Sequence, residues 1–305
     1  MVDADAALVA LGRALAGSGY RFITPTPATH AIVNARPGNE WARSLTDIFG
    51  WSRPFRPGIV SPELMACMEA AGIVVADGEG QRSTIRFSTL DGLLFAHSAY
   101  PTAAADAVFF GPDTYRFASA ILALPARPVR RAVDIGAGAG PGALVVARAH
   151  PGAEVLAVDI NAEALRLTRV NSELNGMAVT AVHSDLLANT PGFYDLIVSN
   201  PPYLVDPGAR AYRHGGGPLG AKLSLAILQA AWHALAPGGT LLLYTGSAIM
   251  DGYDAFYAEA LARLPPEAVV RYHEVDPDVF GEELHGGAYV SADRIAAVVL
   301  TVRKI

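Results

Sequence analysis

The stretch Val133–Gly142, VDIGAGAGPG, decides the fold that the sequence predicts. Two apolar residues flank an acidic residue near the end of a predicted strand, and four glycines follow at alternate positions. The apolar run Leu144–Ala147 then predicts a helix. Glycine permits positive φ and lets a ligand approach where a Cβ would clash, and the helix start presents unpaired N–H groups. The stretch therefore predicts a ligand-binding loop, with a glycine turn that binds nothing as the alternative.

Composition describes a compact globular chain with room for two domains. Of its 305 residues, 51% are hydrophobic and 17% are charged, and no apolar run approaches membrane-spanning length. The first residues include Asp3 and Asp5 and lack a basic leader region, which favours an amphipathic helix over a signal peptide. The single cysteine, Cys67, cannot form an internal disulfide and is interpreted as a buried structural thiol. A cytoplasmic protein without a membrane partner is expected.

Charge argues against a nucleic-acid partner. The net charge is −6, and residues 1–110 contain eight lysines and arginines against ten acidic residues. A nucleic-acid-binding surface is usually rich in basic residues. The composition therefore disfavours nucleic acid as the substrate, although a local basic patch such as Arg127–Arg131 stays compatible with it.

Residues 1–106 are predicted to form a smaller α+β domain. Helices are expected over the first twenty residues and over 40–49 and 62–71, and strands over 73–76, 83–88 and 93–98, with 77–82 as a turn. Thr24–Pro27 is interpreted as a breaker. A winged-helix-like form is one version of this prediction, but the charge balance favours a packing or substrate-holding role.

Residues 107–305 alternate between strand and helix patterns. Strands are expected at 132–135, 154–159, 178–183, 194–199, 240–244, 268–274 and 294–302, and helices at 113–124, 140–150, 162–175, 220–236 and 253–264. Such alternation with continuous apolar strands predicts a doubly wound, mostly parallel, seven-stranded Rossmann-like sheet. Ligands of such sheets bind at the carboxyl ends of the strands.

Acidic residues follow the first three of these strands. Asp134 precedes the glycine loop, Asp159 ends the second strand, and Asp185 follows the third. Asp159 could accept hydrogen bonds from ribose hydroxyls, and Asp185 from an adenine amino group while the Leu186 N–H serves a ring nitrogen. Each acid could instead be a helix cap or a turn residue.

The tetrapeptide Asn200-Pro201-Pro202-Tyr203 directly follows the fourth strand. Proline fixes φ and offers no N–H, so backbone carbonyls and the Asn200 side-chain oxygen are left as rigid acceptors. Two fixed acceptors suit a planar –NH2 group, and the Tyr203 ring can cover its flat face. A simple proline turn is the alternative. The motif predicts a site that orients a nitrogen toward an electrophile.

These motifs in this order resemble the class I S-adenosylmethionine-dependent methyltransferases, and Asn-Pro-Pro-Tyr is similar to the motif of the release-factor N5-glutamine methyltransferases. Gly111–Thr114, the glycine-rich segment 214–220 and the turn Leu235–Gly239 resemble further family segments. The resemblance implies S-adenosylmethionine as cofactor and direct methyl transfer to nitrogen. It implies that catalysis uses Asn200, Pro201, Pro202 and Tyr203. It implies that the cofactor is bound by Thr114, Asp134, Gly136, Ala137, Gly138, Gly140, Asp159, Ile160, Asp185, Leu186 and Asn200.

Several departures concern the acceptor. Gly111 and Tyr115 stand where the family usually has Arg and Glu, Tyr244–Gly246 lacks the family's acidic residue, and residues 1–100 do not resemble its release-factor-binding domain. The sequence predicts methylation of a protein glutamine, with a release factor as one candidate partner. A small molecule or an adenine or guanine nitrogen of nucleic acid stays as the alternative. A dinucleotide-dependent oxidoreductase is disfavoured because it leaves Asn200–Tyr203 without a role. No metal site is expected, and the acidic segment 273–285 is interpreted as a loop near the site's mouth.

Overall fold

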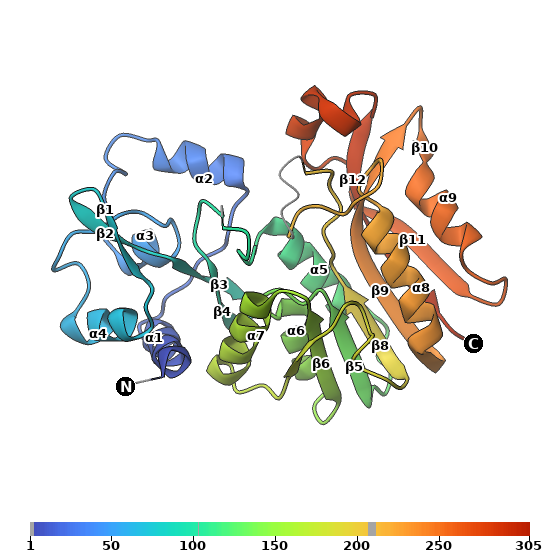
Figure 1. Ribbon diagram of the computed structural model, residues 1–305, viewed down its shortest axis with the longest axis horizontal. Helices are drawn as coiled ribbons and strands as arrows, with labels where there is room; N and C mark the ends of the chain where they lie inside the picture. The colour runs from blue at the N-terminus through green and yellow to red at the C-terminus, as the bar shows by residue number, and fades with distance from the viewer. Residues whose placement is uncertain (1–2, 103, 207–211) are drawn as a thin grey trace. The chain divides into compact units, whose positions relative to one another are not determined.

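The computed structural model describes residues 3–102, 104–206 and 212–305, which form two compact units (Figure 1). The N-terminal unit comprises the described part of Met1–Tyr115 together with Gly138–Pro141 and Glu163–Ala178. The sheet unit comprises Arg116–Ala137, Gly142–Ala162 and the described part of Val179–Ile305. Neither unit is a continuous stretch of chain, and a domain boundary at residue 106 stays a prediction.

The sheet unit is built on a seven-stranded sheet of order β11-β12-β9-β8-β5-β6-β7, with the short β10 paired to β9 (Figure 1). The pairs β8–β9, β5–β8, β5–β6 and β6–β7 are parallel, while β12 pairs antiparallel with β9 and β11. The strands are β5 (Arg131–Ile135), β6 (Glu154–Asp159), β7 (Thr180–His183), β8 (Tyr194–Ser199), β9 (Leu235–Met250), β10 (Tyr253–Asp254), β11 (Val269–Asp276) and β12 (Arg294–Arg303). The predicted mostly parallel, Rossmann-like sheet is confirmed.

Strand β9 is much longer than the predicted 240–244. It pairs with β12 along Thr240–Ile249, because β9 stays buried beyond Tyr244 and most partner residues of β12 form a continuous apolar run. Helices α8 (Lys222–Ala234) and α9 (Ala255–Ala262) pack against β9. The remaining helices are α5 (Pro112–Leu122), α6 (Pro141–Ala149), and the short 3-10 helices η1 (Gly281–His285) and η2 (Gly287–Tyr289). Completely buried Leu241, Leu243 and Val298 belong to the core between these layers.

The N-terminal unit is α+β, as predicted. Its elements are α1 (Ala4–Gly17), α2 (Pro27–Asn34), α3 (Leu45–Phe49), α4 (Pro62–Ala70), α7 (Ala162–Leu174), β1 (Val74–Asp77), β2 (Gly80–Ser83), β3 (Ile85–Leu90) and β4 (Leu93–Ser98). β1–β2 and β3–β4 form separate antiparallel hairpins. Helices α4 and α2 both start at a proline that follows a hydroxyl residue. The Ser61 side chain accepts a hydrogen bond from Leu64 N, and the Thr26 side chain accepts one from Thr29 N, so each hydroxyl caps its helix.

Three local predictions were wrong in this unit. Thr24–Pro27 is not only a breaker, because Thr26 caps the helix α2 that starts at Pro27. The helix predicted for 40–49 begins at Leu45, because the Ser44 side chain caps it there by accepting from Asp47 N. Part of the predicted turn 77–82 belongs to β2, which pairs with β1.

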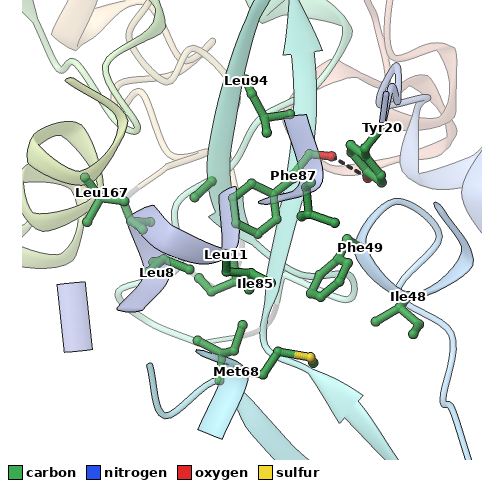
Figure 2. Close-up of a cluster of buried hydrophobic side chains, with 14 of the residues drawn as sticks. Leu8, Leu11, Tyr20, Ile48, Phe49, Met68, Ile85, Phe87, Leu94 and Leu167 are labelled. Atoms are coloured by element: carbon green, nitrogen blue, oxygen red, sulfur yellow. Dashed lines mark hydrogen bonds between the residues drawn. The ribbon is translucent and has the colours of Figure 1, made fainter. Parts of the chain in front are cut away.

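Aromatic and aliphatic side chains fill the core of the N-terminal unit (Figure 2). Leu8 and Leu11 of α1 pack with Ile85 and Phe87 of β3, all with 5% exposure or less. Figure 2 also shows the Tyr20 hydroxyl, which donates to the Phe87 carbonyl at 2.8 Å. Leu167 of α7 belongs to the same cluster, so this helix completes the core of the N-terminal unit.

Asn171 of α7 and Asn175, directly after the last residue of α7, pair with the edge of β4 that does not face β3. The Asn171 amide accepts from Ala96 N at 2.7 Å and donates to Ala96 O at 2.9 Å. Asn175 does the same for Leu94, at 3.0 and 2.8 Å. Residues two apart in a strand direct their backbone groups to the same edge, and residues four apart lie on one helix face. The two side chains therefore continue the hydrogen bonding of the hairpin where no further strand is present.

Candidate functional site

The carboxyl ends of β5, β6, β7 and β8 are joined by short hydrogen bonds. Gly136 N and Ala137 N both donate to Val158 O, at 2.9 and 3.1 Å, and Ser184 N donates to Asp159 O at 3.1 Å. The Ser199 hydroxyl donates to Ile135 O at 2.7 Å. The predicted motifs of the sheet unit therefore follow four neighbouring strands at one edge of the sheet, the edge where such sheets bind ligands.

The glycine loop adopts the backbone that its sequence predicts. Gly136, Gly138 and Gly140 have φ of 70°, 56° and 84°, a region that favours glycine. Gly142 is needed for space instead, since a Cβ there would stand 2.6 Å from Asp134 Oδ2. That oxygen accepts from Ala143 N at 2.9 Å, which fixes the start of α6 on the end of β5.

Asp134 is the acidic residue of the described chain whose pKa is shifted most strongly. It is 2% exposed, and its Oδ1 has no hydrogen-bond partner among the described residues. Burial is the main cause that raises the pKa of Asp134 to about 8; the hydrogen bond from Ala143 N opposes the shift, and the negative charge of Asp159 adds to it. The free side chain is therefore mostly protonated at neutral pH, and a cationic ligand beside its unpartnered oxygen would favour the ionised form.

The second and third acidic positions lie next to each other. Asp159 is half-buried at the end of β6, its Oδ1 accepts from Asn161 N at 2.9 Å, and Ile160 beside it is 60% exposed. Asp185 is exposed after β7, and Leu186 has a φ of 49°. Positive φ is uncommon outside glycine and is enriched at functional loops. The turn after β7 thus holds a strained residue at a predicted cofactor position.

The Asn200–Tyr203 motif is packed rigidly. Asn200 is half-buried, Pro201 is buried, and Tyr203 is only 7% exposed. The Tyr203 ring lies so close to Gly246 of β9 that a Cβ there would stand 2.2 Å from it. Its centroid is 5.9 Å from that of Phe280 in an edge-on arrangement. The ring is therefore packed against β9 and Phe280. The sequence did not mark Gly246 or Phe280 as partners of the motif, because both lie far from it along the chain.

The glycine-rich segment after the motif packs directly on it. Gly215 N donates to Leu204 O at 2.8 Å, and a Cβ on Gly215 would stand 2.6 Å from Pro202 O. A Cβ on Gly220 would stand 2.0 Å from Tyr203 O. These glycines allow the backbone of 212–220 to approach that of 202–204, which explains their place in the sequence.

Arginines neutralise much of the acidic segment 273–285. Arg116 pairs with Asp276 at 2.7 Å, Arg294 with Glu274 at 2.8 Å, and Arg213 with Glu283. Because Phe280 of this segment contacts Tyr203, the segment does lie beside the predicted catalytic motif. No cluster of three metal-ligating side chains occurs in the described residues.

Three predicted cofactor residues belong to the N-terminal unit: Gly138, Gly140 and Thr114. Thr114 is 6% exposed, its N–H donates to Gly111 O at 3.0 Å, and its hydroxyl accepts from Gly111 N at 3.3 Å. The predicted residue therefore closes a local turn at the start of α5.

A cavity of 610 Å³ lies along α8, β9 and α9. Its lining includes Gly246, Ser247, Phe256 and Lys222, but none of the predicted catalytic or cofactor residues. The cavity meets the predicted motif at Gly246, against which the Tyr203 ring lies.

Residues 104–251 match the methyltransferase small domain. The chain is 40% identical over 126 residues to the release factor glutamine methyltransferase of Deinococcus radiodurans, covering 37% of this chain and 44% of that protein. It is 35% identical over 143 residues to the ribosomal protein uL3 glutamine methyltransferase of Neisseria meningitidis, covering 43% and 47%. It is 36% identical over 116 residues to the ribosomal RNA small subunit methyltransferase C of Pasteurella multocida, covering 38% and 32%. The chain thus spans about half the length, or less, of these curated relatives.

A solved structure shares the fold. The M. jannaschii tRNA m1G37 methyltransferase superposes with a TM-score of 0.51 at 16% identity, covering 74% of this chain and 58% of that one. With the glycine loop and the sheet order, these findings define an S-adenosylmethionine-dependent methyltransferase fold. Residues 104–251 match the model of the methyltransferase small domain, and part of the chain is similar in sequence to glutamine methyltransferases of release factors and ribosomal proteins. Among the described residues, no helix is long and apolar enough to cross a membrane.

Proposed function

We propose that this chain transfers the methyl group of S-adenosylmethionine to a planar amide or amino nitrogen, and that the acceptor is a glutamine side chain of a protein. The observation that carries the proposal is the position of Asn200–Tyr203 directly after β8. The hydrogen bond from the Ser199 hydroxyl to Ile135 O links that position to the beginning of the glycine loop. Acceptor motif and cofactor loop thus follow neighbouring strands.

The acidic side chains at the carboxyl ends of β5 and β6 suit the cofactor. S-adenosylmethionine supplies an electrophilic methyl group on a cationic sulfonium and carries an ammonium group. Asp134 offers a buried oxygen without a partner among the described residues, and Asp159 offers a half-buried carboxylate at the end of β6. We infer that Asp134 and Asp159, with Asp185, Leu186 and the loop Gly136–Gly140, hold the cofactor.

The chain's own contribution to transfer is orientation. The Asn200 side-chain oxygen and a proline-fixed carbonyl accept the two N–H groups of the acceptor amide, which fixes its plane. Tyr203, held by Gly246 and Phe280, covers that plane. Holding the acceptor nitrogen in line with the methyl group removes the entropy cost of a bimolecular encounter. This contribution to the rate needs no strong base.

The choice of acceptor rests on the relatives. The Deinococcus and Neisseria proteins are named for glutamine methylation, whereas the Pasteurella protein is named for ribosomal RNA. The net charge of −6 supports a protein acceptor over nucleic acid. A release factor is one candidate partner, and a small-molecule acceptor or an adenine or guanine nitrogen is the alternative. We also propose a cytoplasmic location, which a chain with one unpaired cysteine fits.

Asn200→Ala tests the catalytic role. We expect methyl transfer to fall by about two to four orders of magnitude while S-adenosylmethionine affinity stays within a few-fold, because the lost contact orients the acceptor. Gln229→Ala, which removes an exposed amide from α8, serves as the matched control. Transfer is measured with tritiated cofactor and a cell lysate as the acceptor source, and affinity by calorimetry. Equal loss of affinity and transfer would show that Asn200 only supports the cofactor.

A further inference from the structure

The N-terminal unit contains a buried arginine that no part of the proposed methyl transfer uses. Arg86 of β3 is 5% exposed, and its cross-strand partner is His97 of β4, which is 1% exposed. The Nε and Nη2 atoms of Arg86 have no hydrogen-bond partner among the described residues. A buried guanidinium with two unsatisfied donors is expensive, so a protein retains one where something binds it.

The two unpartnered donors have a particular geometry. Nε–H and the Nη2 group lie on the same edge of the planar guanidinium, on the side away from Cδ. This edge presents two parallel N–H bonds, the arrangement that holds a carboxylate through both oxygens. The free edge of Arg86 is therefore a complete fork for an oxoanion.

The groups around Arg86 supply no counter-charge. Arg86 takes part in none of the ion pairs of the described residues, and its guanidinium lies 5.4 Å from the Phe22 ring centroid. The hydroxyl of Tyr20 is committed to Phe87 O, and Tyr115 OH accepts from Thr24 N at 2.9 Å. Burial lowers the pKa of Arg86 to about 10, so the side chain still carries its charge at neutral pH.

A second buried ring lies near Arg86. His30 is 1% exposed, and its Nε2 has no partner among the described residues. Its Nδ1 lies 3.4 Å from Asn34 Nδ2, which itself donates to Trp51 O at 2.8 Å. Burial, with the charge of Arg86 as the second cause, lowers the pKa of His30 to about 4 and keeps the ring neutral.

Aromatic rings line the same region. His30 lies 4.1 Å from the Tyr100 centroid and 5.4 Å from that of Trp51, and His97 stacks on Phe110 at 4.9 Å. The unpartnered Arg86 nitrogens are donors, and the polar side chains beside them are neutral: Ser88 is hydrogen-bonded to His97 at 2.8 Å. We propose that this face of the β3–β4 hairpin binds a small aromatic or apolar carboxylate, held side-on by Arg86 Nε and Nη2.

Benzoate and its neutral isostere benzamide test this directly. We expect saturable calorimetric binding of benzoate to the whole chain without cofactor, no comparable binding of benzamide, and weaker binding of inorganic phosphate, which does not match the flat lining. Arg86→Met should weaken benzoate at least about tenfold, because each charge-assisted fork contact is strong. Arg86→Lys should also weaken it, since lysine keeps the charge but loses the fork. Arg82→Met, on the neighbouring β2, should leave binding unchanged.

Two readouts separate a ligand site from a structural cation. Arg86→Met removes an unpaired buried charge, so its unfolding midpoint should not fall when no ligand is present. In the wild-type chain, benzoate but not benzamide should shift the Arg86 Nε–H resonance in NMR spectra, a result that needs no variant. The proposal is overturned if benzoate does not bind saturably, if it binds wild type and Arg86→Met equally, or if the resonance does not move. No cofactor is involved, so these outcomes are independent of methyl transfer.

Discussion

Asn171 of α7 offers the sharpest test of how the N-terminal unit is held together. Its side chain is completely buried and makes three hydrogen bonds to backbone: two to Ala96 of β4 and one, at 2.9 Å, to Ala139 O in the glycine loop. Thr168, three residues earlier, donates to Gly138 O at 2.9 Å. One face of α7 therefore fixes the hairpin edge and the glycine loop together.

Asn171→Ala would leave one backbone N–H and two carbonyls of buried residues without these partners. An unsatisfied buried group costs about 1–3 kcal/mol, and a carbonyl with a second lone pair costs at the lower end. The loss of unfolding free energy should then be about 3–5 kcal/mol, a large part of the roughly 5–15 kcal/mol typical of whole proteins.

Asn175→Ala is the matched comparison. Asn175 makes the same pair of bonds to Leu94 and one to its own helix, but none to the glycine loop. Both variants should lower the urea midpoint followed by circular dichroism. Only Asn171→Ala should also weaken S-adenosylmethionine binding, by about tenfold or more, because a flexible loop must be ordered on binding.

Two results would refute this reasoning. A loss of stability below about 1 kcal/mol in Asn171→Ala would mean that the three bonds contribute no more than one ordinary hydrogen bond. Equal effects of the two variants on cofactor affinity would mean that the bond to Ala139 does not position the loop.

Two further predictions concern the sheet unit. The native pKa of Asp134 is raised to about 8, so the unfolded chain loses this proton at a lower pH than the folded chain. Asp134 therefore lowers the stability of the cofactor-free protein as pH rises from about 4 to about 8. In urea titrations across this pH range, Asp134→Asn should remove this pH dependence, and an unchanged dependence of stability on pH would contradict the prediction. Gly246→Ala should displace the Tyr203 ring and lower methyl transfer at least about tenfold, with cofactor affinity retained. Gly281→Ala, where a Cβ meets open space, should behave as wild type. Methyl transfer at the wild-type rate in Gly246→Ala would show that the position of the Tyr203 ring is unimportant.

The sequence was sufficient for the sheet because its strands are unambiguous. The largely apolar runs that end at Ile135, Asp159 and Ser199 are followed or ended by glycine, an acidic residue or proline. The hydrophobic pattern and the residues that end each run therefore indicate the same strands. The end of β9 was underestimated because Thr245-Gly246-Ser247 resembles a turn. Its partner β12, fifty residues further along the chain, makes it a strand, and this pairing has no local signal.

The side-chain environments of the N-terminal unit could not be predicted in the same way. The alternation Ile85-Arg86-Phe87-Ser88 is typical of a strand with one face in water. In the structure Arg86 and Ser88 are buried as well as Ile85 and Phe87, and Phe22 and Tyr115 lie near Arg86 on its side of the hairpin. Likewise, Asn171 resembles a surface residue of an amphipathic helix, and only the unpaired edge of β4 explains its burial.

The most direct test of the central claim is the destination of the methyl group. Wild-type protein and Asn200→Ala are incubated with tritiated S-adenosylmethionine and a cell lysate, and the label is separated into protein, nucleic-acid and small-molecule fractions. We expect label in one protein band, released as methylamine on acid hydrolysis, and none with Asn200→Ala. Label in RNA, DNA or the small-molecule fraction would contradict a glutamine acceptor, and labelling that persists at the wild-type rate in Asn200→Ala would contradict the catalytic motif itself.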